Sequence, residues 1–175
     1  MGILEFRFHG RGGQGMVTAA QVLAAAAILE GKYAQAFPEF GPERRGAPVK
    51  SYLRVSERPI YIREPVLHPD VIVVADQSLF QAENPLEGAR PTTILVVNGI
   101  YKAPQKTYYV DATSLAMKIL GRPIVNTALI GAVVKATGIV SLSSVAEDLK
   151  KYFTGRLYDL NVKLIESAYQ ETKEL

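Results

Sequence analysis

The stretch HGRGGQG, from His9 to Gly15, has the residue types of an anion-binding turn. Three of its glycines follow the spacing GxGxxG, after an alternation of apolar and polar residues and before an alanine-rich run. Where such a turn joins a strand to a helix, an anion can approach bare backbone N–H groups, whose partial positive charge the helix dipole reinforces. Arg11 would add a full positive charge. The candidate binding residues are Gly10, Arg11, Gly12, Gly13, Gln14 and Gly15.

Several interpretations of this turn remain open from the residues alone. The turn lacks the Gly-Lys-Ser/Thr ending of a P-loop, so nucleotide hydrolysis is unsupported. Binding of NAD or FAD would need an acidic residue about 20 residues further on to hold a ribose hydroxyl. The nearest candidate is Glu39, which lies beyond Pro38. The turn could instead hold a phosphate-bearing ligand or a partner's backbone, or the glycines could serve only to let helix pack closely on strand.

The composition excludes several kinds of chemistry. The chain has no cysteine, which rules out disulfides, thiolate zinc sites, a cysteine nucleophile and cysteine-ligated iron–sulfur clusters. The two histidines, His9 and His68, belong to no metal-ligand spacing, and no pairing with serine or carboxylate indicates catalysis. We therefore predict no metal site and no catalytic residue, and we expect His9 to end a strand and hydrogen-bond the turn.

The net charge of +3 does not indicate nucleic-acid binding, but the charges are unevenly distributed. Between residues 44 and 64, basic residues outnumber the two acidic residues, Glu57 and Glu64. The basic residues are Arg44, Arg45, Lys50, Arg54, Arg58 and Arg63. An acidic partner or ligand is one explanation of the excess, and a solvated hairpin with scattered basic side chains is the other.

The turn must be held by a strand before it and a helix after it. Leu4, Phe6 and Phe8 alternate with polar residues, which predicts a strand with one polar face that is half-buried and not central. A helix is predicted over 14–30 and a second strand over 32–37. The following segment, FPEFGPERRGAP, holds three prolines and two glycines and predicts a shaped loop.

The middle of the chain reads as strands. Residues 49–56 and 59–64 resemble the two halves of an antiparallel hairpin. Three continuous apolar runs are typical of buried parallel strands, namely DVIVVADQ, TTILVVNG and KTYYVDAT. Asp76 and Asp111 end two of these runs, where open sheets bind ligands but where aspartates also serve as caps.

The last third of the chain is predicted to form helices over residues 113–120, 127–136, 144–153 and 157–172. The apolar residues of 127–136 cover nearly every direction, so this helix should be buried on most sides, beneath other helices or a partner. Ser144 and Glu147 have the spacing of a capping box, which predicts a helix start there.

Together these elements predict an α/β fold, a three-layer domain with a mainly parallel sheet, a Rossmann-like glycine loop and an inserted antiparallel hairpin. We expect residues 1–175 to form one domain. The sequence contains no run of about 18 apolar residues and no secretory signal, so we expect a cytoplasmic protein that contacts neither membrane nor nucleic acid.

Two stretches in this order, HGRGGQG and FPEFGPERRGAPVKSYLRVS, closely resemble the gamma subunit of the 2-oxoacid:ferredoxin oxidoreductases. The likeness extends to DVIVVAD, ILVVN and NTALIGAVVKATGIV, and so spans nearly the whole chain. The form FPEFGPERRGAPV is similar to the pyruvate type, which is also used with branched-chain 2-oxoacids such as ketoisovalerate.

The resemblance implies membership of a complex that converts pyruvate, coenzyme A and oxidised ferredoxin into acetyl-CoA, CO2 and reduced ferredoxin. In that family thiamine diphosphate carries the decarboxylation, and [4Fe-4S] clusters carry the electrons. This chain has neither cysteines for a cluster nor a GDG motif for magnesium and the thiamine diphosphate. The resemblance therefore implies that subunits of alpha, beta and delta type hold these groups, while the gamma chain is noncatalytic and serves assembly.

The resemblance also suggests a part in binding coenzyme A, which carries a diphosphate and a 3′-phosphate. The glycine turn is chemically suited to these groups, as are Arg44 and Arg45. The two arginines could equally form a salt bridge to Glu39, to Glu43 or to a partner subunit. A stand-alone dinucleotide-dependent oxidoreductase and a plain interaction domain remain as alternative functions.

Overall fold

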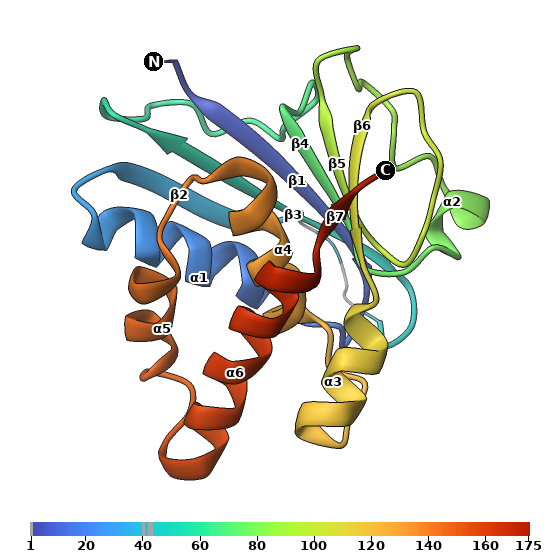
Figure 1. The fold of residues 1–175 in the computed structure, drawn as a ribbon. Coiled ribbons are helices and arrows are strands. Elements are labelled where there is room, and N and C mark those ends of the chain that lie inside the picture. The colour runs from blue at the N-terminus through green and yellow to red at the C-terminus, as the bar shows by residue number, and fades with distance from the viewer. Residues whose placement is uncertain (1, 40, 42–43) are drawn as a thin grey trace.

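The computed structural model describes residues 2–39, 41 and 44–175, which form a twisted sheet with most helices on one face (Figure 1). The strands are β1 (Leu4–Arg11), β2 (Tyr33–Pro38), β3 (Pro48–Ser56), β4 (Val71–Val74), β5 (Ile94–Asn98), β6 (Lys106–Val110) and β7 (Lys173–Glu174). The helices are α1 (Met16–Leu29), α2 (Leu79–Ala82), α3 (Ala112–Leu120), α4 (Asn126–Thr137), α5 (Leu142–Leu149) and α6 (Gly155–Glu171).

The sheet is mostly parallel at its centre. Its seven strands lie in the order β2-β3-β1-β4-β5-β6-β7. Strands β1, β4, β5 and β6 are parallel, while β3, β2 and β7 pair antiparallel to their neighbours. The apolar runs predicted as buried parallel strands are confirmed as β4, β5 and β6. Helices cover one face of these strands, and loops and α2 cover the other.

The N-terminal strand is more deeply buried than its pattern indicated. The prediction of a half-buried, non-central strand is wrong, since β1 lies between β3 and β4. Phe6 and Phe8 pack toward the helices, as expected from alternation. On the opposite face Arg7 is only 6% exposed and His9 is fully buried. The polar face of β1 is therefore an interior surface, not a solvent-facing one.

The helical layer packs closely because small residues line it. Helix α1 buries mostly alanines and lies against β2 and β3. Helix α4 contacts β5 and β6 and is surrounded by α1, α3 and α6, so its predicted burial on most sides is confirmed, and the covering elements are helices of this chain. Gly131 on α4 lies directly against the carbonyl of Ile165 on α6, where a side chain would collide with that backbone.

Helix α5 begins earlier than its sequence pattern indicated. The predicted start in a capping box of Ser144 and Glu147 is wrong. Ser141 is the N-cap, and its hydroxyl accepts a hydrogen bond from the N–H of Ser144 at 3.2 Å. Serines stand at positions 141, 143 and 144, so the sequence offers more than one suitable N-cap residue.

The second face of the sheet is covered mainly by loops. Helix α2 supplies Leu79 to a small apolar cluster over β4 and β5. The third layer predicted from the sequence is therefore thin in the described part of the chain, with the four-residue α2 and loops in place of a row of helices.

Two buried arginines hold those loops. Arg54 on β3 donates to the carboxylate of Glu5 at 2.7 Å, to the side chain of Gln35 at 2.8 Å and to the carbonyl of Glu64 at 2.6 Å. Arg7, on the neighbouring strand, donates to the carbonyls of Val66, Pro85 and Glu87. The guanidinium groups thus bind loop backbone, and the buried carbonyls of Val66 and Pro85 would otherwise lack these donors.

The predicted hairpin between residues 49–56 and 59–64 is wrong. Residues 49–56 do lie in a strand, but β3 pairs with β2 on one side and with β1 on the other, so neither of its edges is free. Residues 57–65 contain no strand and lead into the segment held by Arg54 and Arg7. The antiparallel partners of β3 are β1 and β2, both of which precede the loop, and not the segment after β3.

No helix in residues 2–39, 41 and 44–175 combines the length and the apolar character that a bilayer crossing requires.

Replacing Arg7 by methionine tests the role of the buried guanidinium. The change leaves the loop carbonyls without donors, so we expect the free energy of unfolding to fall by roughly 3–5 kcal/mol. Urea unfolding measures this, with Arg58→Met as the control because Arg58 is exposed. A loss below about 1 kcal/mol for Arg7→Met would show that the loops are held by other contacts.

Candidate functional site

The glycine turn joins β1 to α1 as the sequence predicted. Gly13 and Gly15 have φ values of 93° and 75°, a left-handed backbone that side chains rarely tolerate. Gly15 is the N-cap of α1, and no side chain caps the helix. The turn therefore presents the positive end of a fourteen-residue helix at the carboxyl edge of the parallel strands.

At Gly12 and Gly15, other atoms of the chain occupy the space that a side chain would need. Gly12 lies against the carbonyl of Arg44, and its N–H donates to the carbonyl of Ala47 at 2.8 Å. The side chain of Asn126, the first residue of α4, would lie 2.6 Å from a Cβ atom on Gly15. Close packing thus explains why side chains are absent at Gly12 and Gly15.

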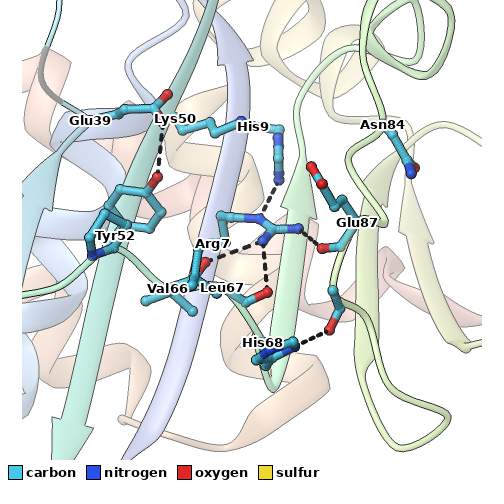
Figure 2. Close-up of a pocket in the computed structure, with 12 residues that line it drawn as sticks. Arg7, His9, Glu39, Lys50, Tyr52, Val66, Leu67, His68, Asn84 and Glu87 are labelled. Carbon is cyan, nitrogen blue, oxygen red and sulfur yellow. Dashed lines mark hydrogen bonds between the residues drawn. The ribbon is translucent and has the colours of Figure 1, made fainter.

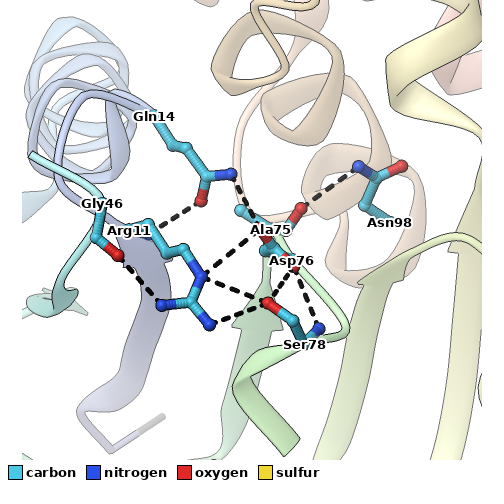
Figure 3. A network of polar contacts seen from close by, with 7 residues as sticks. All are labelled: Arg11, Gln14, Gly46, Ala75, Asp76, Ser78 and Asn98. Atoms are coloured by element: carbon cyan, nitrogen blue, oxygen red, sulfur yellow. Dashed lines mark hydrogen bonds and ion pairs between the residues drawn. The ribbon is translucent and has the colours of Figure 1, made fainter. Parts of the chain in front are cut away.

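Arg11 and Gln14 form a polar network with the residues after β4 (Figure 3). The Arg11 guanidinium lies 3.6 Å from the Asp76 carboxylate and donates to the hydroxyl of Ser78 and the carbonyl of Gly46. The Gln14 side chain accepts from the Arg11 N–H at 2.7 Å and donates to Asp76 at 3.3 Å. The charge of Arg11 is therefore shared with an internal partner.

A cavity of about 540 Å³ opens beside this network, at the carboxyl ends of β4, β5 and β6. Asp76, Asn98 and Asp111 line it, together with Gln14 and other residues. Both carboxylates serve as local caps, since Asp76 accepts from the N–H of Ser78 and Asp111 from that of Ser114. The walls suit ligand groups that donate hydrogen bonds, such as hydroxyls, better than they suit phosphates.

The electrostatics of these carboxylates favour their charged forms. Burial alone would raise the pKa of Asp76, but hydrogen bonds from Ser78 and Gln14 and the charge of Arg11 lower it below the ordinary value. Hydrogen bonds from Ser114 lower the pKa of Asp111. The cavity therefore carries two anionic groups at neutral pH.

Arg44 and Arg45 lie on the segment that packs on the turn. A backbone bridge joins Gly12 to Arg45, and both arginine side chains are exposed. The structure thus brings the two predicted binding elements together. Within the described residues neither arginine forms an ion pair. Glu39 instead accepts a hydrogen bond from Tyr52 at 3.3 Å, while Glu43 lies outside the described residues.

The position of Glu39 argues against a dinucleotide in the turn. Glu39 follows β2, and β3 lies between that strand and β1. Its N–H donates to the carbonyl of Lys50, level with His9 and short of the glycine turn. The side chain lines a separate cavity. No acidic group at this position can hold the ribose of a nucleotide bound to the turn.

That second cavity, of about 480 Å³, was not predicted from the sequence (Figure 2). Arg7, His9, Lys50 and Tyr52 form part of its lining, and they come from the facing polar rows of β1 and β3. The period-two series of polar residues in β1 was the available signal. The pattern alone predicts a half-buried strand with a polar face, because the loops that cover this face are distant in the sequence.

His9 belongs to a buried hydrogen-bonded chain. Arg7 Nε donates to His9 Nε2 at 2.9 Å, so the imidazole proton resides on Nδ1, which lies 3.1 Å from a carboxylate oxygen of Glu83. The expectation that His9 ends the strand and bonds the turn is wrong, because its ring nitrogens contact Arg7 and Glu83. His68 lies in a loop, with its Nδ1 atom 3.3 Å from the carbonyl oxygen of Gly88.

Burial is the largest influence on the protonation of His9 and Tyr52 in this cavity. It lowers the pKa of His9, and the nearby Arg7 charge acts in the same direction, against the hydrogen bond to Glu83. The hydrogen bond from His9 lowers the pKa of Glu83. Burial, together with Glu39, raises the pKa of Tyr52 to about 12. The cavity thus contains a neutral imidazole and a protonated phenol at neutral pH.

The model of the pyruvate ferredoxin/flavodoxin oxidoreductase family matches residues 5–171. The chain belongs to this family. It is 48% identical to the pyruvate/ketoisovalerate oxidoreductases common subunit gamma of Pyrococcus furiosus, covering 98% of each chain. The resemblance based on HGRGGQG and FPEFGPERRGAPVKSYLRVS is thereby confirmed.

Solved structures share the fold of this family member. The crystal structure of pyruvate oxidoreductase subunit PORC from Thermotoga maritima matches with a TM-score of 0.88 and 37% identity, over 99% of both chains. A 2-oxoglutarate:ferredoxin oxidoreductase from Magnetococcus marinus, solved with coenzyme A bound, has the same fold in 31% of its chain, with a TM-score of 0.81 and 19% identity over 97% of this chain.

The low pKa of His9 predicts a pH dependence of stability. Below the ordinary histidine pKa of about 6.5, His9 binds a proton in the unfolded chain but not in the folded chain. The free energy of unfolding therefore decreases as the pH decreases, by up to about 1.4 kcal/mol per pH unit. Between pH 7 and pH 5 we expect a steeper loss for the wild type than for His9→Gln. Urea unfolding at each pH measures the two slopes.

The exposed His68 provides the matched control for this experiment. His68→Gln removes a histidine outside the buried chain of Arg7, His9 and Glu83, and its slope is the reference for that of His9→Gln. Parallel slopes for the wild type and His9→Gln would contradict the assignment of a buried neutral imidazole.

Proposed function

We propose that this chain is the gamma subunit of a pyruvate:ferredoxin oxidoreductase complex. The complex converts pyruvate, coenzyme A and oxidised ferredoxin into acetyl-CoA, CO2 and reduced ferredoxin. The observation that carries the proposal is end-to-end similarity to subunits named for pyruvate/ketoisovalerate oxidoreductases and for pyruvate oxidoreductase. The same names leave room for branched-chain 2-oxoacids as substrates of the complex.

In this proposal the chain is noncatalytic and its partners carry the redox chemistry. A chain without cysteine has no thiolate to ligate an iron–sulfur cluster. Subunits of alpha, beta and delta type then hold thiamine diphosphate, magnesium and the [4Fe-4S] clusters, and pass electrons to ferredoxin. The buried ionisable groups of this chain, such as Arg7 and His9, are engaged with one another and with backbone, which supports a structural role for them.

We further propose that the Rossmann-like glycine turn and the segment over it contact coenzyme A. The exposed Arg44 and Arg45 supply positive charge at the start of α1, whereas Arg11 is paired with Asp76 and the Gly12 N–H is already bonded. Arginine binds phosphate through a planar fork of donors. The phosphates therefore fit the two arginines, and hydroxyl-bearing parts fit the carboxylate-lined cavity beside the turn.

Adding or omitting this chain tests its place in the complex. Pyruvate-driven reduction of ferredoxin should require the gamma chain together with its native partner subunits, and the isolated chain should show none. Turnover of pyruvate, or tight binding and use of NAD(H), by the isolated chain would refute the proposal and favour a stand-alone dehydrogenase.

Replacing Arg44 and Arg45 together by alanine tests the coenzyme A contact. Each charged hydrogen bond is worth roughly 1.5–3 kcal/mol, so we expect the Michaelis constant for coenzyme A to rise at least about tenfold with little change in kcat. Arg58→Ala with Arg63→Ala is the matched control, because these arginines are also exposed. Loss of subunit association would instead indicate a bridge to a partner, and no change in either property would exclude both roles.

A further inference from the structure

An apolar groove of about 470 Å³ lies between α3 and the start of α6. Its lining comes from the end of α3, the connection to α4, the first residue of α4, the segment before α6, and the first two turns of α6. The residues are Leu120, Arg122, Ile124, Asn126, Phe153, Leu157 and Asn161. Figure 1 shows both helix ends at the same pole of the molecule.

Large apolar side chains are exposed at this groove. Of the side chains that line it, Ile124 is 44% exposed and Leu157 is 50% exposed. The polar atoms of Asn161 are occupied internally, since it accepts from Thr127 and donates to the carbonyl of Leu157. Clustered exposed apolar side chains around a concave surface mark a protein-binding site.

The rim of the groove is electropositive. Arg122 lines it and Arg156 precedes Leu157, and neither forms an ion pair within the described part of the chain. By contrast Lys150 and Lys151 are paired with acidic side chains on α5. The seventeen-residue α6 begins here, with no side-chain cap and no acidic residue in its first turn, so its dipole adds positive potential. The acidic Asp159 comes only later in α6.

We propose that this groove binds an amphipathic segment of a partner subunit that carries large apolar side chains flanked by aspartate or glutamate. The apolar side chains fill the space between Ile124 and Leu157, and the acidic group lies against Arg122 and the open start of α6. Apolar anchors with charged flanks are the usual pattern for a helix or extended segment in a groove. The inference rests on the proposed function, because membership of a complex supplies the partner.

The groove adjoins the glycine turn through one residue. Asn126 lines the groove and also packs against Gly15. A segment seated in the groove therefore contacts the start of α4, which rests on the turn. The partner is thereby placed close to the proposed coenzyme A contacts while occupying a different surface from Arg44 and Arg45.

Competition during assembly tests the proposal in the whole complex. A tagged partner subunit is co-expressed with equal amounts of wild-type and variant gamma chain, and mass spectrometry gives the ratio recovered. For Leu157→Asp we expect incorporation at most one-tenth that of the wild type. For Arg122→Glu we expect incorporation several-fold below that of the wild type, and lower still when the salt concentration is lowered, because the repulsion is then screened less.

Tyr61→Asp and Arg58→Glu are the matched controls. Tyr61 is 86% exposed, and both residues lie on the loop at 57–65 rather than at the groove. Both variants should be incorporated as well as the wild type. Equal incorporation of Leu157→Asp would overturn the groove proposal. Arg122 is exposed, so its variant keeps the test valid if thermal melting shows that Leu157→Asp is misfolded.

Two further results separate this proposal from its alternatives. Failure of the wild-type chain itself to join thiamine-dependent partners would refute the proposed function, whereas full incorporation of groove variants beside an assembling wild type would refute the groove alone. Sedimentation of the isolated chain gives the remaining case. A wild-type dimer that Leu157→Asp converts to monomer would identify a second copy as the occupant and overturn the partner-subunit assignment.

Discussion

The interaction on which the loop-covered face of this fold depends is the donation of buried guanidinium hydrogen bonds to backbone carbonyls. Arg7 and Arg54 lie on neighbouring strands and point from the same face of the sheet. Their donors bind the segment at 64–67 and the carbonyls of Pro85 and Glu87. A row of helices is therefore not needed on that face, because the arginines satisfy loop carbonyls that would otherwise be buried unpaired. The same geometry fixes the tautomer of His9 through Arg7 Nε.

The glycine turn shows how one motif can serve packing and still be compatible with the proposed binding surface. The backbone of residues 44–47 rests on Gly12, and the side chain of Asn126 rests on Gly15. These contacts account for two of the glycines without any ligand. They also carry Arg44 and Arg45 to the turn, so an anion at this edge would meet exposed arginines as well as the start of α1. Packing and binding are thus compatible explanations of the same residues.

The proposed role of the chain within a larger enzyme agrees with where its charges and apolar groups lie. Ionisable groups in the interior are neutral or engaged internally, as in the chain from Arg7 through His9 to Glu83. The features open to other molecules are at the surface, in the arginine pair over the turn and in the groove between α3 and α6. A subunit that binds and orients, while its neighbours carry out the redox steps, would have this distribution.

The sequence by itself determined the presence of the five longer helices, the buried parallel strands, the glycine turn and the family, but not α2 or the start of α5. These are local properties, because hydrophobic period, helix breakers and left-handed glycines act within a few residues. Only the tertiary structure decided that β1 is central, that β3 pairs with β2 rather than with 59–64, and that Arg11 is held by Asp76. Each of these depends on residues many positions apart. A polar row such as Glu5, Arg7 and His9 has the same pattern whether water or a distant loop covers it, and only folding brings Val66 and Glu83 to it.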